Sequence, residues 1–313
     1  MTETTKAIFE SFEVRKSRKQ KDAFIDWVTP VAEAQGYEVS IDKGALGVKN
    51  IVIGSPKDAK VVFTAHYDTC AALPFPNFIT PKSVLIFMLY QLLIVVGIMA
   101  LGIAVEVLFI LLNVPYAHLA LSAVMLTACA LILVGPANKH TANDNTSGVT
   151  AVIDIMRVMP EELRGKAAFI LFDLEEAGLL GSSHYRSAHK SEIKDKLMVN
   201  FDCVSDGKNI LFVVKKGARP FAPALRAAFP SEGEFVVEVA EKGAIYPSDQ
   251  ASFPRGVGVA SLKRSKFLGL LYMDRIHTKR DTVYESENIE YLTRGAVRLT
   301  EALSRGEMSA GKA

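Results

Sequence analysis

Two long apolar segments constrain the fold of this chain more than any other feature. Residues 84–105 contain no charged side chain, and residues 117–135 contain no Asp, Glu, Lys or Arg, with His118 near their start. A helix of about 20 apolar residues spans the hydrocarbon core of a bilayer. The short segment 113–116 between them, Asn-Val-Pro-Tyr, is a turn whose tyrosine suits a membrane interface. We therefore predict a transmembrane helical hairpin at residues 83–137.

The alternative is a pair of buried helices in an oligomer interface or a lid, and two such segments in succession favour the membrane. Glu106 lies about 33 Å along a helix that begins near Val84, which places its carboxylate at headgroup level. Lys82 precedes the hairpin and Lys139 follows it, whereas the turn has no Lys or Arg. The positive-inside rule then predicts an integral membrane protein whose remaining residues face the cytoplasm. The sequence leaves the oligomeric state open.

Composition excludes several other classes of protein. The 313 residues carry 36 Lys and Arg against 34 Asp and Glu, so a net charge of +2 gives no nucleic-acid-binding signature. The three cysteines, Cys70, Cys129 and Cys203, are odd in number and widely spaced. They argue against a disulfide framework and for a reducing compartment. Residues 1–22 have no apolar core, which predicts that they are not a secretory signal.

Outside the apolar segments, hydrophobic periodicity predicts strands that alternate with helices. Several of the strands are continuous apolar runs, which is typical of a largely parallel sheet covered on both faces. We predict an α/β fold, a three-layer α/β/α sandwich around a mixed, largely parallel sheet, made by residues 1–82 and 138–313 with the hairpin inserted in a loop. The predicted strands are 37–41, 50–53, 60–65, 167–173, 197–201, 210–214, 235–239 and 257–262, and the predicted helices are 7–35, 147–159, 178–188 and 287–304.

Five basic residues between positions 15 and 21 fall on the first of these helices. They are interpreted as a solvated helix face, with contact to anionic lipid as the alternative.

Polar side chains accumulate where the predicted strands end. The carboxyl ends of strands in an open α/β sheet form the crevice in which ligands bind. Histidines and carboxylates at such an edge have the composition of a zinc site, because imidazole and carboxylate are both zinc ligands. The residues concerned are His66, Asp68, Asp144, Glu175, Glu176, Asp202 and His277.

Glu175 and Glu176 are the most informative of these residues. They stand side by side after the apolar run FILF, and adjacent like charges need a positive partner. Successive residues at a strand end point in different directions, so one glutamate can hold a metal ion while the other moves protons. Each motif alone also has a plain structural explanation, such as carboxylates at a helix N-terminus or turn chemistry around Asp144. Only their combination and order are specific.

Six motifs together carry a family resemblance, in the order HYD (66–68), NDNTSG (143–148), EEAGLLGS (175–182), NFD (200–202), SDQASF (248–253) and IHTKRDT (276–282). They resemble the di-zinc aminopeptidase family that includes aminopeptidase Y and the bacterial leucine aminopeptidases, metallopeptidase family 28. Relatives of that family include glutamate carboxypeptidases and glutaminyl cyclases. The resemblance spans residues 61–282, and the long apolar insert departs from the family pattern.

The resemblance implies two Zn²⁺ ions, with Co²⁺ or Mn²⁺ as substitutes. By position, His66 and Asp202 resemble the ligands of one ion, and Glu176 and His277 resemble those of the other. Asp144 resembles the carboxylate that bridges both ions, and in the family the peptide bond that follows it is cis.

The resemblance also implies a division of catalytic work. Glu175 is expected to accept a proton from the water that bridges the metals, which becomes hydroxide, and to deliver that proton to the leaving amine. Asp68 is expected to fix the tautomer of His66. Tyr246 and Asp249 are candidate substrate-binding residues. Cys70 and Cys203 flank metal motifs and are interpreted as small buried residues rather than ligands.

The expected function is therefore a membrane-anchored aminopeptidase, with a peptide and the lipid bilayer as partners and no nucleic acid. The hairpin would keep it close to peptides derived from membrane segments. A dipeptidase, a carboxypeptidase or a cyclase on the same scaffold is the alternative enzyme, although the cyclases work with one metal ion. A catalytically silent membrane scaffold is the alternative from another class.

Overall fold

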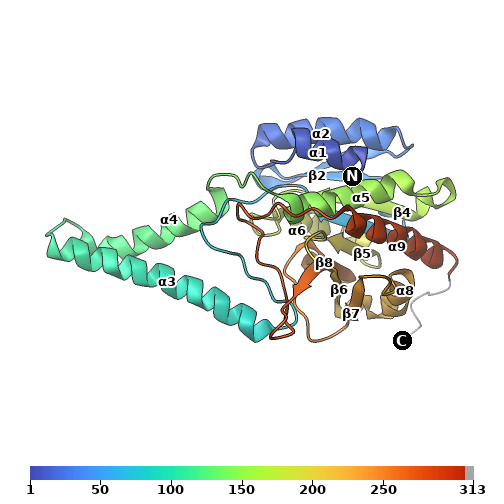
Figure 1. Ribbon diagram of the computed structural model, residues 1–313. Helices are drawn as coiled ribbons and strands as arrows, with labels where there is room; N and C mark the ends of the chain where they lie inside the picture. The colour runs from blue at the N-terminus through green and yellow to red at the C-terminus, as the bar shows by residue number, and fades with distance from the viewer. Residues whose placement is uncertain (307–313) are drawn as a thin grey trace.

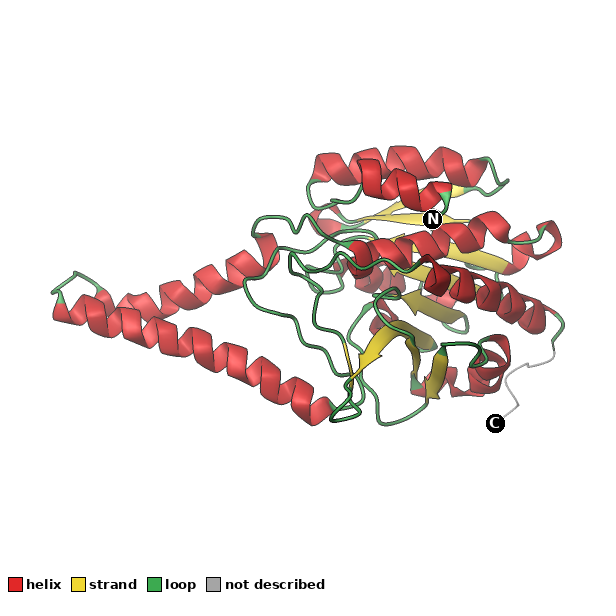
Figure 2. Ribbon diagram, viewed as in Figure 1, coloured by secondary structure: helices red, strands yellow, loops and turns green. Residues whose placement is uncertain are grey.

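A mixed sheet of nine strands forms the centre of the computed structural model, which describes residues 1–306 (Figure 2). The strand order is β1-β2-β4-β3-β5-β8-β6-β7, with β9 paired to β8. The central strands β4, β3, β5 and β8 are parallel to one another, as predicted. The strands are β1 (Val39–Lys43), β2 (Lys49–Ile53), β3 (Val61–His66), β4 (Ala167–Phe172), β5 (Leu197–Phe201), β6 (Asn209–Val214), β7 (Val236–Ala240), β8 (Gly256–Arg264) and β9 (Leu271–Tyr272).

Helices cover both faces of the sheet, which confirms the predicted three-layer sandwich (Figure 1). Successive side chains of a strand point to opposite faces, so Phe63 joins the largest apolar cluster and Val62 joins a smaller one on the other face. One face packs against α1 (Glu3–Ser11), α2 (Arg18–Glu33), α5 (Gly148–Val158), α8 (Ala222–Ala228) and α9 (Ser286–Ser304). The other face packs against α6 (Leu180–Ala188) and α7 (Lys190–Ile193).

The single helix predicted at 7–35 is wrong, because the chain forms two helices there. Ser17 caps α2: its hydroxyl accepts from the Gln20 N–H at 3.3 Å, and the Gln20 side chain accepts from the Ser17 N–H at 2.9 Å. The intervening turn buries Arg15, whose guanidinium donates to the main-chain oxygen of Tyr67. Lys21 is also buried and forms an ion pair with Asp173 at 2.7 Å. The solvated-face interpretation was therefore wrong for these two basic residues.

The two apolar segments form helices that extend away from the sheet and meet at their far ends (Figures 1 and 2). These are α3 (Val84–Leu111) and α4 (Ala120–Val134), and α4 is preceded by the short helix η2 (Ala117–Leu119). α3 alone, and η2 together with α4 (Ala117–Val134), are each long and apolar enough to cross a membrane, and only 6% of the most apolar stretch of each span is buried. The core helix of a soluble protein would be mostly buried instead. Gly102 marks their close approach, since a Cβ there would lie 2.6 Å from the Leu121 side chain.

The segments that precede α3 and follow α4 are joined to the sheet-containing part of the chain by main-chain hydrogen bonds. Before α3, Ile79 pairs with Met273, and Pro81 accepts from the N–H of Ile245 at 2.9 Å. After α4, Pro136 accepts from the N–H of Ala72 at 2.8 Å. Both ends of the insertion are therefore held in place.

Candidate metal centre

A cavity of about 350 Å³ opens at the carboxyl ends of β3, β4 and β5. The parallel arrangement brings these ends to one edge of the sheet, as expected for a ligand crevice. All five predicted metal ligands and the predicted proton carrier line this cavity, namely His66, Asp144, Glu175, Glu176, Asp202 and His277.

Each of these side chains is delivered by a defined element. His66 is the last residue of β3, and Asp202 follows β5 directly. Glu175 and Glu176 lie in the loop between β4 and α6, and Asp144 lies in the π-helical turn η3 (Ala142–Ser147) that leads into α5. The last of the six, His277, lies in the loop between β9 and α9 and has a positive φ of 60°. The peptide between Asp144 and Asn145 is cis, as the resemblance implies.

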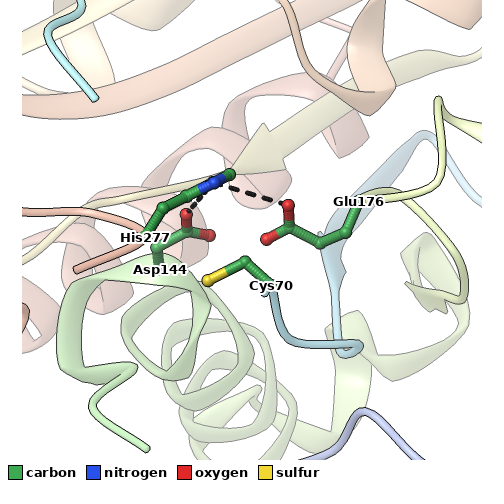
Figure 3. A group of neighbouring side chains, drawn as sticks. All are labelled: Cys70, Asp144, Glu176 and His277. Carbon is green, nitrogen blue, oxygen red and sulfur yellow. Dashed lines mark ion pairs between the residues drawn. The ribbon is translucent and has the colours of Figure 1, made fainter. Parts of the chain in front are cut away.

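Asp144 stands between two histidines and presents a different oxygen to each. Its Oδ1 lies 3.4 Å from Nε2 of His66, and its Oδ2 lies 2.9 Å from Nε2 of His277. The next neighbours complete two groups. Asp202 Oδ1 is 3.6 Å from His66 Nε2. Glu176 Oε2 is 3.4 Å from His277 Nε2 (Figure 3). The structure thus arranges one carboxylate between a His66–Asp202 group and a His277–Glu176 group.

These two groups fit two cations. Ligand atoms about 2.0–2.2 Å from a zinc ion in tetrahedral geometry lie roughly 3.3–3.6 Å from one another, which is close to the observed spacings. Asp202 Oδ1 and Glu176 Oε1 are buried and have no hydrogen-bond partner among residues 1–306. Buried carboxylate oxygens without partners are costly unless a cation satisfies them. The donor set of imidazole nitrogen and carboxylate oxygen is the one that zinc takes.

The pKa shifts of the ionisable groups in the cavity also favour a bound cation. Burial lowers the pKa of His277, but the charges of Glu176 and Asp144 outweigh it and raise that pKa to about 9. Burial raises the pKa of Glu176 to about 8 although His277 opposes the rise. Burial likewise raises the pKa of Glu175 well above its ordinary value, with Glu176 and Asp249 adding to the effect. The raised pKa values of the two glutamates show that their ionised forms are disfavoured in this buried cavity, a cost that a bound cation would relieve.

Asp68 positions both glutamates. Its two carboxylate oxygens accept from the main-chain N–H groups of Glu175 at 3.0 Å and Glu176 at 3.2 Å. The carboxylate is 3.6 Å from His66 Nδ1, whereas the main-chain oxygen of Asp68 is only 3.1 Å from that nitrogen. The tautomer of His66 is therefore set by the Asp68 carbonyl, which leaves Nε2 facing the cavity. The predicted contact between the two residues exists, but it is made by the main chain.

Two residues that the sequence analysis did not single out also shape the centre. Asp281 accepts from the N–H groups of Asn143 at 2.8 Å and Asp144 at 2.9 Å, so it holds the turn that carries the shared carboxylate. Asn145 donates to the main-chain oxygen of Phe201 at 3.1 Å, next to Asp202. Both belong to motifs that carry the family resemblance, and their polar side chains beside ligands were the available signal.

Replacing Asp281 with asparagine should lower zinc affinity about 10- to 100-fold, the usual cost of losing a group that orients a ligand. The amide can accept one of the two N–H groups but places its own NH₂ against the other. Competition with a chromogenic chelator measures the change. Asp274→Asn, in the same loop but outside the cavity lining, is the control and should leave the affinity unchanged. Equal affinity of the Asp281 variant and the wild-type protein would show that this contact does not support the metal centre.

Of the remaining predicted residues, some line the cavity and others are buried outside its lining. Tyr246 lines the cavity, and its hydroxyl donates to the main-chain oxygen of Asp202 at 3.1 Å. Asp249 is fully buried and does not line the cavity, although its charge adds to the raised pKa of Glu175, and burial raises the pKa of Asp249 itself to about 7. Cys203 and Cys70 are each 1% exposed, as interpreted. However, the sulfur of Cys70 lies within 4.8 Å of ligand atoms of Asp144, Glu176 and His277, so it belongs to the cluster (Figure 3).

Solved structures of aminopeptidases and of glutaminyl cyclases share this fold. The LapA aminopeptidase of Legionella pneumophila is 16% identical, with a TM-score of 0.59 over 99% of this chain and 68% of that one. A leucine aminopeptidase precursor of Bacteroides thetaiotaomicron is 14% identical, with a TM-score of 0.58 over 95% and 94%. The glutaminyl cyclase of Porphyromonas gingivalis is also 14% identical, with a TM-score of 0.58 over 95% and 97%. At these identities the likeness establishes the fold alone.

The sequence itself gives the family. No curated protein sequence matches the chain. Residues 121–298, more than half of the chain, match peptidase family M28. The matched region contains Asp144, Glu175, Glu176, Asp202 and His277, while His66 lies before it on the other side of the apolar helices. The chain therefore belongs to peptidase family M28.

Proposed function

We propose that this protein is a membrane-anchored di-zinc aminopeptidase that faces the cytoplasm and removes N-terminal residues from peptides. Residues 1–82 and 138–313 form its catalytic domain, and residues 83–137 form its anchor. The observation that carries the proposal is the placement of Asp144 between two histidine–carboxylate groups, with Glu175 in the same cavity. Membership of a peptidase family and the fold shared with aminopeptidases support it.

The residues divide the metal binding among themselves. His66 and Asp202 would hold one zinc ion, Glu176 and His277 would hold the other, and Asp144 would be a ligand of both. Co²⁺ or Mn²⁺ would also suit these ligands. The bound ions supply the positive charge that polarises the scissile carbonyl and acidifies water.

Glu175 carries the proton. Its carboxylate lines the cavity beside the ligands, and Asp68 holds its main chain in place. It takes the proton of the attacking water and passes it to the nitrogen of the leaving peptide.

The glutaminyl cyclases among the similar structures make a cyclase the second candidate function. Both activities begin at a peptide N-terminus, so the fold does not separate them. The two complete ligand groups around Asp144 favour the hydrolase, because one ion would need only one of them. A dipeptidase or carboxypeptidase would use the same ligands with a different cavity wall. A silent scaffold would have no need to retain Glu175 beside the ligands.

Two observations support a membrane anchor: α3 and α4 are exposed, and the hairpin is flanked by Lys82 and Lys139. A bilayer would bury the exposed apolar side chains of a helical hairpin of this length. Their connecting turn lacks Lys and Arg, which supports a cytoplasmic catalytic domain.

One preparation of the full-length protein tests the proposal. We expect the protein to stay in the membrane fraction after an alkaline carbonate wash and to need detergent for release. The purified protein should contain about two zinc ions per chain. It should hydrolyse aminoacyl anilides with a free amine and leave N-acetylated ones intact. Cleavage of the blocked substrates, or cyclisation of N-terminal glutamine without hydrolysis, would refute the aminopeptidase assignment.

A further inference from the structure

The wall of the metal cavity includes part of the apolar hairpin. Phe87 and Gln91, on the first two turns of α3, line the same cavity as the predicted metal ligands. The rest of α3 extends away from the sheet (Figure 1). The helix that we assign to the bilayer is therefore also a component of the proposed active site.

The first turns of α3 are packed against the sheet-containing part of the chain. Phe87 lies against a buried apolar cluster that contains Ile79, Tyr246 and Ile276. The ring centroid of Phe78 also lies 5.6 Å from those of Tyr90 on α3 and Tyr272 on β9, so aromatic contacts join the helix to the strand. Contacts of this kind hold the position of the wall relative to the metal ligands.

The wall offers both apolar surface and an amide group, which suit the N-terminal end of a peptide. Phe87, Ile79 and Ile276 give the cavity an apolar side, opposite in character to the carboxylates and histidines. Gln91 is half-buried, and its amide forms no hydrogen bond with any residue in the described part of the chain. A polar side chain in so apolar a helix is costly unless it faces protein, water or a ligand. Gln91 meets this requirement by facing the cavity.

We propose that Phe87 and Gln91 form the substrate-recognition wall of the enzyme and select peptides with an apolar N-terminal side chain. Phe87 packs against that side chain, and the Gln91 amide binds the peptide main chain. Because Phe87 and Gln91 lie in the first two turns of α3, the N-terminus is captured where this helix enters the bilayer. The inference rests on the proposed function and names its substrate class.

The test uses binding and turnover separately. Four full-length proteins carry Glu175→Gln to stop hydrolysis: one has no further change, and the others add Phe87→Ala, Gln91→Ala or Leu89→Ala. Leu89 is the matched control because it lies on the same turn, is 54% exposed and does not line the cavity. Calorimetry in detergent measures the Kd of Leu-Gly-Gly and Ala-Gly-Gly, and zinc is measured on each sample.

The expected result is a selective loss. Phe87→Ala should weaken Leu-Gly-Gly about tenfold or more and Ala-Gly-Gly much less, since part of an apolar pocket is removed. Gln91→Ala should weaken both peptides about 2- to 10-fold, as expected for one lost hydrogen bond. Leu89→Ala should change neither Kd, and all four proteins should keep the same zinc content.

Several outcomes overturn the inference. Unchanged Kd values in both cavity variants, an equal loss in Leu89→Ala, or no peptide binding by the Glu175→Gln protein would each do so. The proposed function is judged separately, by hydrolysis with Glu175 present. Normal hydrolysis with leucine preference unaltered by Phe87→Ala defeats the inference alone. Absent hydrolysis together with Phe87-dependent peptide binding defeats the aminopeptidase assignment alone.

Discussion

Replacing Glu175 with glutamine is expected to lower kcat by about 10²- to 10⁴-fold while the zinc content stays unchanged. Glutamine has almost the same shape but cannot accept a proton from water. The main-chain hydrogen bond from residue 175 to Asp68 does not depend on the side chain, so the loop should keep its position. Steady-state kinetics with an aminoacyl anilide and metal analysis of the same sample measure both quantities.

The control for this change is Glu161→Gln, which removes an exposed carboxylate outside the cavity and should leave kcat unaltered. The pattern of the kinetic constants is also informative. A loss confined to kcat, with KM little changed, means that Glu175 acts in the chemical step. Turnover equal to the wild-type value would remove Glu175 from its proposed role, whereas loss of zinc would make it a metal-binding residue instead.

Replacing Asp144 with alanine is expected to reduce zinc content from about two ions per chain to less than about one and to lower activity by roughly 10³-fold or more. Its two oxygens face different histidines, so a single substitution weakens both groups at once. The carboxylates that remain would also lose a nearby cation and would repel one another more strongly. Metal analysis after dialysis, followed by kinetics with and without added zinc, measures the effect.

Asp154→Asn is the matched control for this prediction, because Asp154 is another buried carboxylate but binds Thr2 at 3.1 Å, away from the cavity. It should keep both ions. If Asp144→Ala retained its zinc, the assignment of Asp144 as the shared ligand would be wrong. If Asp154→Asn lost as much zinc, general destabilisation rather than ligand loss would explain the result. Circular dichroism of both variants would show whether the fold is intact.

Local patterns in the sequence were sufficient for the strands that carry the site. Strands β3, β4 and β5 lie within one residue of their predicted bounds, because buried parallel strands are continuous apolar runs with polar residues at their ends. The apolar helices were equally clear from the sequence, although α3 continues to Leu111, beyond the charge-free segment that ends at residue 105. Hydrophobic periodicity gave a wrong prediction at the N-terminus, where it indicated a single helix. The turn that buries the guanidinium of Arg15 divides this segment into α1 and α2. The short elements α7, α8 and β9 were not predicted, since each carries too few residues to show a period.

The sequence by itself determined which side chains could serve as ligands and on which strand ends they lie, because residue type and apolar periodicity are local properties. Only the tertiary structure decided which groups meet. It placed the two oxygens of Asp144 toward different histidines, gave the Asp68 carboxylate to the main chain of both glutamates, and brought Phe87 and Gln91 of the hairpin into the cavity. These contacts join residues far apart in the chain, and their geometry depends on the packing of whole elements rather than on any pattern along one of them.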